Sequence, residues 1–287
     1  MSISAIILTK NEEKNIERAI KSVKFCDQII VVDDYSSDNT VKKARELGAK
    51  TFQRRLNNNF SAQRNFAMEK AKGEWLLFVD ADEEVTRELR GEISRVILSE
   101  VPLSGTSRRI PLQSNLKMYG DSSVSRRNVG IPRNDAWRIK RRDFWWGREL
   151  RYGEVRKISQ FGLIRLVRKG SGYWAGKVHE EYKVKNEKLK IESLENYLNH
   201  YPHPKVKDFL EEINFYSTLR AKELFDQRKK TNILEIVLYP LGKFLLTYFI
   251  KLGFLDGPAG FAYAFFMSFH SFLVRAKLFQ YNMKHET

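Results

Sequence analysis

A run of apolar residues that ends in a cluster of carboxylates constrains this chain more than any other feature. The run covers residues 75–79, and residues 80–84 then supply four carboxylates in five positions. An uninterrupted apolar run of this length is typical of a strand buried on both faces. Carboxylates gathered where such a strand ends repel one another and lose water, so they need a compensating partner. A divalent cation with a phosphate-bearing ligand is one such partner. The start of a helix is another, and Glu83 and Glu84 are expected to belong to the helix that follows.

The first 80 residues alternate between strand-like runs and segments with helical spacing. We expect strands at residues 4–8, 28–32, 50–54 and 75–79, and helices at 16–23, at 61–72 and in the segment that reaches residue 47. Gly48 and Gly73 stop the second and third helices. Strands that alternate with helices across short loops predict an α/β fold, in which a mostly parallel sheet has helices on both faces.

Polar residues directly follow three of the expected strands. They lie at residues 9–12, 33–34 and 80–82. Ligands of such sheets bind beyond the carboxyl ends of the strands, so these clusters are expected to converge on one edge and form a nucleotide site. No G-x-G-x-x-G follows the first strand, and the chain has no G-x-x-x-x-G-K-[ST]. Acidic residues in place of glycine loops favour a metal that bridges the diphosphate.

The formal net charge of +16 is concentrated in the middle of the 287-residue chain. Residues 105–177 contain 18 Lys and Arg against 5 Asp and Glu. Such a patch attracts nucleic acid, an acidic membrane surface or a phosphorylated acceptor, although a solvated basic face is the plain alternative. Cys26 is the sole cysteine, which excludes an internal disulfide and favours a reducing compartment. We expect no signal peptide, because the N-terminus enters a strand-like pattern directly.

Four sequence blocks carry a family likeness. They are Leu8-Thr9-Lys10-Asn11-Glu12, Val31-Val32-Asp33-Asp34-Tyr35-Ser36-Ser37-Asp38-Asn39-Thr40, Ser61-Ala62-Gln63-Arg64-Asn65, and Gly73-Glu74-Trp75 with Asp80-Ala81-Asp82. In this order and at this spacing, they resemble the inverting GT-A glycosyltransferases of family 2. The resemblance implies a GT-A (Rossmann-like) fold, a nucleotide-sugar donor and a divalent metal, Mg²⁺ or Mn²⁺.

Three shorter blocks narrow the likeness. They are Gly176-Lys177-Val178-His179-Glu180-Glu181, Leu198-Asn199-His200-Tyr201 and Leu255-Asp256-Gly257-Pro258-Ala259-Gly260-Phe261. They are similar to the branch that contains lipopolysaccharide core β-1,4-glucosyltransferases, whereas residues 111–133 depart from that branch. The likeness implies a UDP-sugar donor, with UDP-glucose the first candidate, and a lipid-linked, phosphorylated core saccharide as acceptor.

The resemblance assigns the donor side of the site. Asp82 would bind the metal on the diphosphate, and Asp80 would lie near the ribose or the metal. Asp34 would accept the imide N–H of uracil, with a turn-capping Asp as the alternative. The other nucleotide-facing residues would be Thr9, Asn11 and Glu12 in the first loop, and Arg64 near the phosphates. A helix-capping Asn11 and a surface Arg64 are the alternatives.

Inversion by direct displacement needs a base that deprotonates the acceptor hydroxyl as it attacks. Glu180 matches the position of the family's base, and Glu181 is its neighbour and competitor. Successive residues of an extended segment face opposite ways, so one of the two is expected to face the site. His179 would orient the base or touch the phosphate. His200 would join the metal shell, a structural histidine being the alternative.

Tryptophans flank the basic segment and would suit an acceptor. Trp145, Trp146 and Trp174 have faces that can stack on sugar rings, and Arg148 has the fork that holds a phosphate. Core tryptophans with surface arginines are the alternative. Residues 1–204 are expected to form the catalytic domain, in which residues 1–100 bind the nucleotide and residues 101–204 bind the acceptor.

Residues 205–287 form the expected C-terminal helical appendage. Apolar residues recur at helical spacing over 206–219, and two strongly apolar runs follow at 233–255 and 258–274. Glu235, Pro240, Lys243 and Lys251 interrupt the first run. We expect amphipathic or re-entrant helices that lie in one leaflet with their lysines at the headgroups. A transmembrane hairpin and a soluble core remain alternatives.

The sequence thus predicts a metal-dependent inverting glycosyltransferase that is peripheral at the cytoplasmic face of the inner membrane. A polyprenyl-phosphate sugar transferase of the same fold is the near alternative. A basic nucleic-acid-binding protein is the alternative from another class, but it gives no purpose to the acidic strand ends, so no nucleic-acid partner is expected. A catalytically inactive scaffold protein is the third alternative.

Overall fold

The structure is a computed structural model that describes residues 1–99, 134–177, 180–186, 191–202 and 205–284. Within these residues the strands are β1 (Ile3–Thr9), β2 (Gln28–Asp33), β3 (Lys50–Gln53), β4 (Trp75–Asp80), β5 (Glu83–Val85), β6 (Ala136–Trp145), β7 (Arg148–Leu150), β8 (Leu163–Arg168), β9 (Gly172–Ala175), β10 (Glu181–Val184) and β11 (Glu192–His200). The α-helices are α1 (Ile16–Ser22), α2 (Thr40–Glu46), α3 (Phe60–Lys70), α4 (Arg87–Ser99), α5 (Arg156–Phe161), α6 (Val206–Asp226), α7 (Ile233–Leu245) and α8 (Gly257–Lys284). Short turns of other helix types are η1 (Gly153–Val155), η2 (Leu246–Ile250) and η3 (Gly253–Asp256).

The N-terminal half has the predicted alternation of strands and helices. β1 pairs in parallel with β2 on one side and with β4 on the other, and β2 pairs in parallel with β3. Side chains of β4 from residue 75 to residue 79 are fully buried, as expected of a strand covered on both faces. The predicted mostly parallel sheet with helices on both faces is therefore confirmed.

Alternate residues of the central strands pack into two separate cores. Ile7 and Val31 point to the side covered by α1, α2 and α4. Ile6 and Val32 point to the side covered by α3 and the β9–β10 hairpin. Because successive side chains of a strand face opposite ways, each strand contributes to both layers.

The second half extends the sheet with strands of mixed direction. The strand order is β3-β2-β1-β4-β8-β6-β11-β5, and β7 pairs with β6. β8 is antiparallel to both β4 and β6, whereas β11 is parallel to β6. β5 pairs antiparallel with β11, so the carboxylate segment after β4 lies beside the strand that ends at His200.

One expectation about the carboxylate cluster is wrong. Glu83 and Glu84 were expected in the helix that follows, but they form β5, and α4 begins at Arg87. The pairing of β5 with β11 captures this segment, and the side chain of Glu83 is fully buried. Strand pairing with a distant segment thus overrides the local preference of acidic residues for a helix start.

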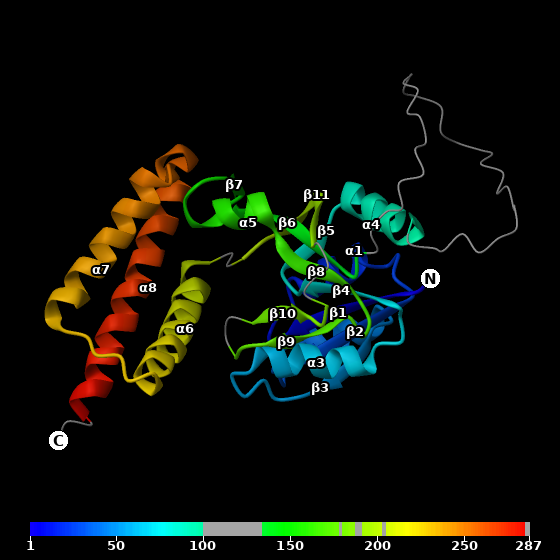
Figure 1. Cartoon of the computed structure of the whole chain (residues 1–287), viewed down its shortest axis with the longest axis horizontal. Helices are drawn as coiled ribbons and strands as arrows, with labels where there is room; N and C mark the ends of the chain where they lie inside the picture. The colour runs from blue at the N-terminus through cyan, green and yellow to red at the C-terminus, as the bar shows by residue number, and fades with distance from the viewer. Residues whose placement is uncertain (100–133, 178–179, 187–190, 203–204, 285–287) are drawn as a thin grey trace, which may run out of the picture.

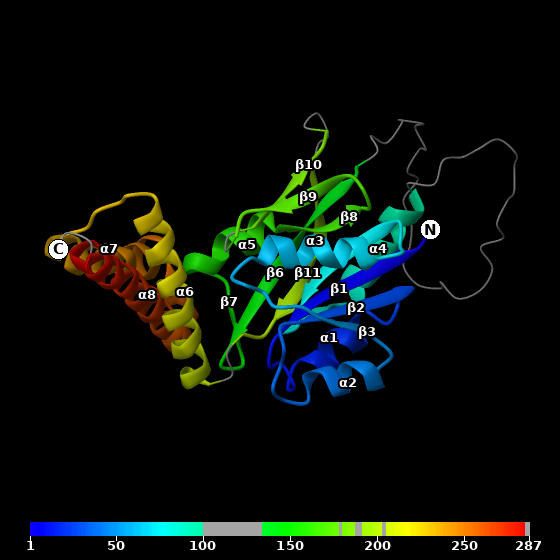
Figure 2. The same cartoon turned by 90° about the horizontal axis from the view of Figure 1, so that it is seen from below.

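Helices α6, α7 and α8 lie together beside the sheet in both views (Figures 1 and 2). α6 and α8 pack through two apolar clusters, one around Phe209 and Ile213 and one around Leu224 and Leu278. Within the described residues, Ile233–Ile250 is one stretch long and apolar enough to cross a membrane by length and composition. The expectation that Lys243 and Lys251 reach headgroups does not match their contacts, because both bind Glu154.

Candidate functional site

Three polar clusters meet at the carboxyl edge of the sheet, as their positions after the strands predict. The register pairs Thr9 with Asp33 on one side and Leu8 with Asp80 on the other. The backbone N–H of Asp34 donates to the carbonyl of Thr9 at 2.9 Å, which ties the first two strand ends together. The site is therefore assembled from consecutive strand ends of a parallel sheet.

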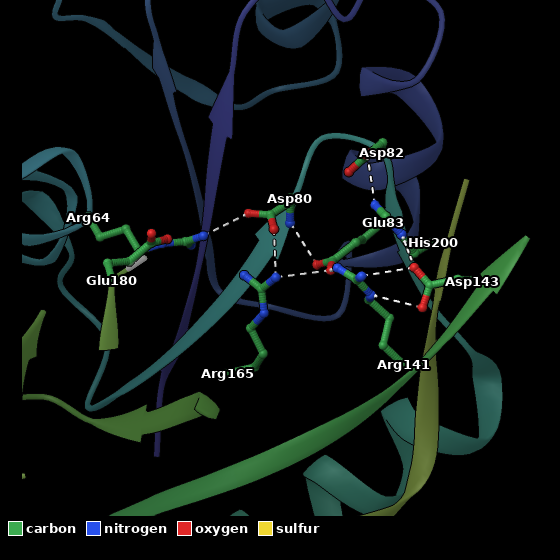
Figure 3. Close-up of polar contacts among 9 residues, drawn as sticks. All are labelled: Arg64, Asp80, Asp82, Glu83, Arg141, Asp143, Arg165, Glu180 and His200. Carbon is green, nitrogen blue, oxygen red and sulfur yellow. Dashed lines mark hydrogen bonds and ion pairs between the residues drawn. The ribbon is translucent and has the colours of Figure 1, made fainter. Parts of the chain in front are cut away.

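Asp80 lies between two guanidinium groups (Figure 3). Arg64 Nη2 donates to Asp80 Oδ1 at 3.0 Å, and Arg165 Nη2 donates to Asp80 Oδ2 at 2.6 Å. Burial alone would raise the pKa of Asp80, but Arg165 and Arg64 hold it well below its ordinary range. Asp80 is thus a fixed carboxylate at the centre of the edge.

Glu83 is a fully buried carboxylate behind Asp80. Its Oε1 lies 3.0 Å from Arg165 Nη2 and 3.6 Å from Arg141 Nη1, and its Oε2 accepts from the Asp80 backbone N–H at 2.9 Å. Burial, the largest influence, raises the pKa of Glu83, against the two guanidiniums. Its contacts give it a structural role, which is to orient the segment that carries Asp80 and Asp82.

The two predicted metal-binding residues are in contact. His200 Nε2 lies 3.1 Å from Asp82 Oδ2, and His200 Nδ1 lies 2.5 Å from Asp143 Oδ1. Burial and Arg141 favour the neutral ring, yet the carboxylates of Asp82 and Asp143 raise the pKa of His200 to about 9. A carboxylate behind a histidine is the usual arrangement around a metal-binding imidazole, since it fixes the ring and its tautomer.

This donor set fits a cation that also has ligands from outside the protein. An Asp oxygen and an imidazole nitrogen suit Mn²⁺ or Mg²⁺, and both ions retain substrate phosphates and water among their ligands. In the part of the chain that the structure describes, no group of three or more His, Cys, Asp or Glu side chains is arranged to hold a metal. A cation bound by Asp82 and His200 would therefore need the diphosphate of a nucleotide sugar to complete its shell.

The predicted base is held at the same edge. Arg64 Nε donates to Glu180 Oε1 at 2.9 Å, and the Glu180 side chain is 14% exposed. Glu181, by contrast, is 73% exposed and pairs with Lys183 at 2.7 Å. Of the two competitors, Glu180 therefore faces the carboxylates and Glu181 faces solvent. His179 lies outside the described residues.

Arg64 joins the donor side of the site to the predicted base. It is buried on α3, binds both Asp80 and Glu180, and lies 4.8 Å from the ring centroid of Trp174. Its Nη1 has no hydrogen-bond partner in the protein. A surface position, the alternative reading of Arg64, does not match this burial.

The loop at residues 9–12, which is predicted to face the nucleotide, is held to the segment after β2 by side-chain contacts. Asn11 has φ +54°, and its Oδ1 accepts from the backbone N–H of Ser37 at 2.8 Å. It does not cap α1, which begins at Ile16. Asp34 pairs with Lys10 at 2.7 Å and accepts from the Leu56 N–H at 3.0 Å. These contacts shape the loop. The role of Asp34 as acceptor of the uracil imide N–H stays a prediction.

Burial also marks two residues of this edge. Thr9 is buried, and its hydroxyl has no hydrogen-bond partner in the protein. Burial raises the pKa of Glu12 to about 7, with further contributions from Asp82 and Asp38. Glu12 therefore lies close enough to Asp82 for their charges to interact.

The predicted acceptor residues divide by exposure. Trp145 is 2% exposed and packs edge-on against Phe209, and Trp174 is 7% exposed beside Phe78. Their burial favours the alternative of core tryptophans. Trp146 is 50% exposed and stacks on Trp145, so it keeps an outer face for a sugar ring. Arg148 begins β7 next to it and is exposed.

Sequence reasoning missed a contribution from α6. Tyr216 stacks on Phe60 at a centroid distance of 6.3 Å, which places this helix beside the start of α3. Glu212 lies one turn earlier on the same face. Burial, together with the charges of Asp82 and Glu12, raises the pKa of Glu212 to about 7. The spacing of the apolar residues identified α6 as a helix, but no motif indicated that it lies against the site.

Comparison with known proteins finds relatives among glycosyltransferases. A sequence model of Glycosyl transferase family 2 matches residues 4–145. An uncharacterized glycosyltransferase of Rickettsia bellii is 31% identical over 277 residues, which cover 96% of this chain and 85% of that protein. The lipopolysaccharide core biosynthesis glycosyltransferase LpsC of Rhizobium meliloti is 25% identical over 291 residues, or 98% and 93% of the two chains. A solved glucosyl-3-phosphoglycerate synthase of Mycobacterium tuberculosis, in complex with Mn²⁺, UDP and glucosyl-3-phosphoglycerate, aligns over 34% of this chain and 40% of that one, with 22% identity and a TM-score of 0.31.

Fold and site together define a glycosyltransferase of the GT-A type. The relation to the Rickettsia protein extends over nearly the whole chain, and the family model covers β1, β2 and β4, whose ends carry the three polar clusters. The chain belongs to glycosyltransferase family 2. The resemblance seen in its sequence blocks, including the likeness to lipopolysaccharide core enzymes, is confirmed.

Proposed function

We propose that this enzyme moves a sugar from a UDP-sugar, with UDP-glucose the first candidate, to a lipid-linked, phosphorylated saccharide of the lipopolysaccharide core. The contact between Asp82 and His200 carries the proposal, because it places two ligands suited to Mg²⁺ or Mn²⁺ side by side at the carboxyl edge of the sheet. Asp143 holds the other ring nitrogen of His200. The choice of acceptor rests on the relative named for lipopolysaccharide core biosynthesis, which aligns with 98% of this chain.

The reaction is a single displacement with inversion at C1 of the donor sugar. Glu180 takes the proton from the acceptor hydroxyl while the oxygen of that hydroxyl forms a bond to C1. The bond between C1 and the UDP oxygen breaks in the same step. A bound Mg²⁺ or Mn²⁺ supplies Lewis-acid stabilisation of the departing diphosphate. Asp82 and His200 would hold that ion. Arg64 orients the base by donating its Nε–H to Glu180 Oε1.

The basic and apolar surfaces suit an acceptor presented at a membrane. Residues 1–204 form the catalytic unit in this proposal, and residues 205–287 hold it at the cytoplasmic face of the inner membrane as a peripheral protein. Trp146 and Arg148 are the acceptor-side candidates with exposed side chains. A ring face and a guanidinium fork suit a phosphorylated saccharide.

A donor screen tests the proposal directly. Purified protein would be incubated with Mg²⁺ or Mn²⁺, a panel of UDP-sugars and truncated lipopolysaccharide acceptors, and products would be read by mass. We expect the acceptor to gain one hexose from one UDP-sugar, and the gain to disappear in EDTA. Transfer to polyprenyl phosphate instead, or metal-independent transfer, would overturn the assignment of acceptor or metal.

A further inference from the structure

The segment Ile233–Ile250 presents a continuous apolar face to the outside of the protein. Its mean hydropathy is 1.6, and 6% of it is buried in the structure. Large side chains recur at helical spacing along α7 and η2 and are between 51% and 65% exposed: Leu234, Leu238, Leu241, Leu245 and Phe249. A contiguous apolar face of this size indicates an interaction surface.

The opposite face carries Lys243 and, one residue beyond the segment, Lys251, and a single acid binds both. Lys243, Thr247 and Lys251 follow one another at intervals of four residues, so they lie on one side of the helix. Lys243 Nζ lies 2.9 Å from Glu154 Oε2, and Lys251 Nζ lies 2.7 Å from Glu154 Oε1. The Thr247 hydroxyl donates to Glu154 Oε1 at 3.1 Å. The two lysines that interrupt the apolar run therefore face the catalytic unit.

Backbone contacts fix this side of the segment further. Gly153 N–H donates to the carbonyl of Lys251 at 3.0 Å. The carboxylate of Asp256 accepts from the backbone N–H groups of Arg151 and Tyr152, at 3.1 Å and 3.0 Å. Residues 151–154 thus contact the apolar segment at Lys243, and they contact the residues that follow it at Lys251 and Asp256. A membrane-crossing orientation of Ile233–Ile250 would require these contacts to break and leave Lys243 in hydrocarbon.

We propose that the Ile233–Ile250 face docks in the plane of one leaflet of an anionic membrane and holds the catalytic unit against it without crossing. The inference rests on the proposed function only in taking a membrane as the partner. Arg228, Lys229 and Lys230 directly precede the segment and complement anionic headgroups. An apolar face beside basic residues is the pattern of helices that lie in the membrane interface.

Vesicle sedimentation tests the surface without donor or acceptor. Leu241→Glu with Leu245→Glu should lower the fraction of protein bound to phosphatidylglycerol-containing vesicles at least tenfold. Leu98→Glu on α4, where the parent side chain is 68% exposed, is the matched control and should bind as wild type does. Equal binding by all three proteins would overturn the proposal. The proposal would also be overturned if the wild-type protein is a dimer and the double substitution Leu241→Glu with Leu245→Glu makes it monomeric. In that case a second copy of the chain covers the apolar face of Ile233–Ile250.

A depth measurement separates in-plane docking from crossing. The native Cys26 is buried, so a fluorescent NBD label can be placed on Leu234→Cys or Ile250→Cys. After the protein is added to preformed vesicles, external dithionite should reduce the label at both positions, because both ends lie in the outer leaflet. Protection of one position until the vesicles are lysed would show a crossing segment. Neither readout depends on transferase activity, so failure here is distinguishable from failure of the proposed reaction.

Discussion

His200 Nε2 lies 3.1 Å from Asp82 Oδ2, although 118 residues separate them in the chain. β11 lies between β5 and β6, and its register sets His200 opposite both Glu83 and Asp143. Two strand pairings, rather than any local motif, therefore bring the histidine to the acidic edge.

Asp82 and His200 should govern metal dependence together. Asp82→Ala removes the proposed oxygen ligand and should lower Mn²⁺-dependent transfer at least about 100-fold. Asp143→Asn changes the group that orients His200 and should weaken Mn²⁺ affinity in the presence of UDP about 10–100-fold. Calorimetric titration of Mn²⁺ into the UDP-bound protein gives the affinity. Glu84→Gln is a nearby control that should bind Mn²⁺ normally, and near wild-type transfer by Asp82→Ala would refute the metal assignment.

Glu180→Gln should abolish transfer and spare UDP binding. The amide cannot take the proton of the acceptor hydroxyl, and loss of a general base lowers rates about 10²–10⁴-fold. Glu181→Gln is the matched control, because that side chain is 73% exposed and its partner is Lys183. Steady-state transfer and equilibrium UDP binding are the measurements. A fall in UDP affinity with Glu180→Gln would show instead that Glu180 serves to hold Arg64.

Glu83→Ala should destabilise the protein strongly. Glu83 is fully buried and contacts two guanidiniums, so its removal leaves Arg165 and Arg141 with less compensating charge inside the protein. Breaking a buried ion pair in this way typically costs about 3–5 kcal/mol. Urea unfolding monitored by circular dichroism gives the free energy. Glu84→Ala should change it far less, and similar values for the two variants would contradict the structural role of Glu83.

Glu212→Gln should stabilise the metal-free protein at pH 8 and have little effect near pH 4. The pKa of Glu212 is raised to about 7 by burial and by the charges of Asp82 and Glu12. A carboxyl with a raised pKa loses stability as pH rises from its ordinary value toward its folded value. The neutral amide avoids that loss, so the gain should grow between about pH 4.5 and pH 7 and be complete above about pH 7.

The readout for Glu212 is the midpoint of thermal unfolding in EDTA. We expect a rise of about 2–4 °C at pH 8, which corresponds to ~1 kcal/mol in proteins of 150–250 residues. Added Mn²⁺ with UDP should reduce the difference, because a cation near Asp82 offsets the repulsion. A rise in the unfolding midpoint that is equally large at pH 4 and pH 8 would show that Glu212→Gln acts through side-chain packing and not through charge.

Local patterns in the sequence were sufficient for the N-terminal sheet. Apolar runs and helical spacing repeat within ten residues, so they report strands and helices that form from neighbouring positions. The direction of the strands then placed Asp34, Asp80 and Asp82 on one edge without any knowledge of tertiary contacts. The sequence blocks around Glu180 and His200 added their expected roles through family resemblance.

Tertiary structure decided which charged and aromatic side chains are buried. Glu83 belongs to a strand because β11 pairs with it, and Arg64 is enclosed because Asp80 and Glu180 bind it from two sides. Trp145 faces the α6–α8 core instead of solvent. Burial of a charge depends on partners that lie far away in the chain, because only a nearby opposite charge offsets the loss of water. A short sequence pattern contains no record of those partners.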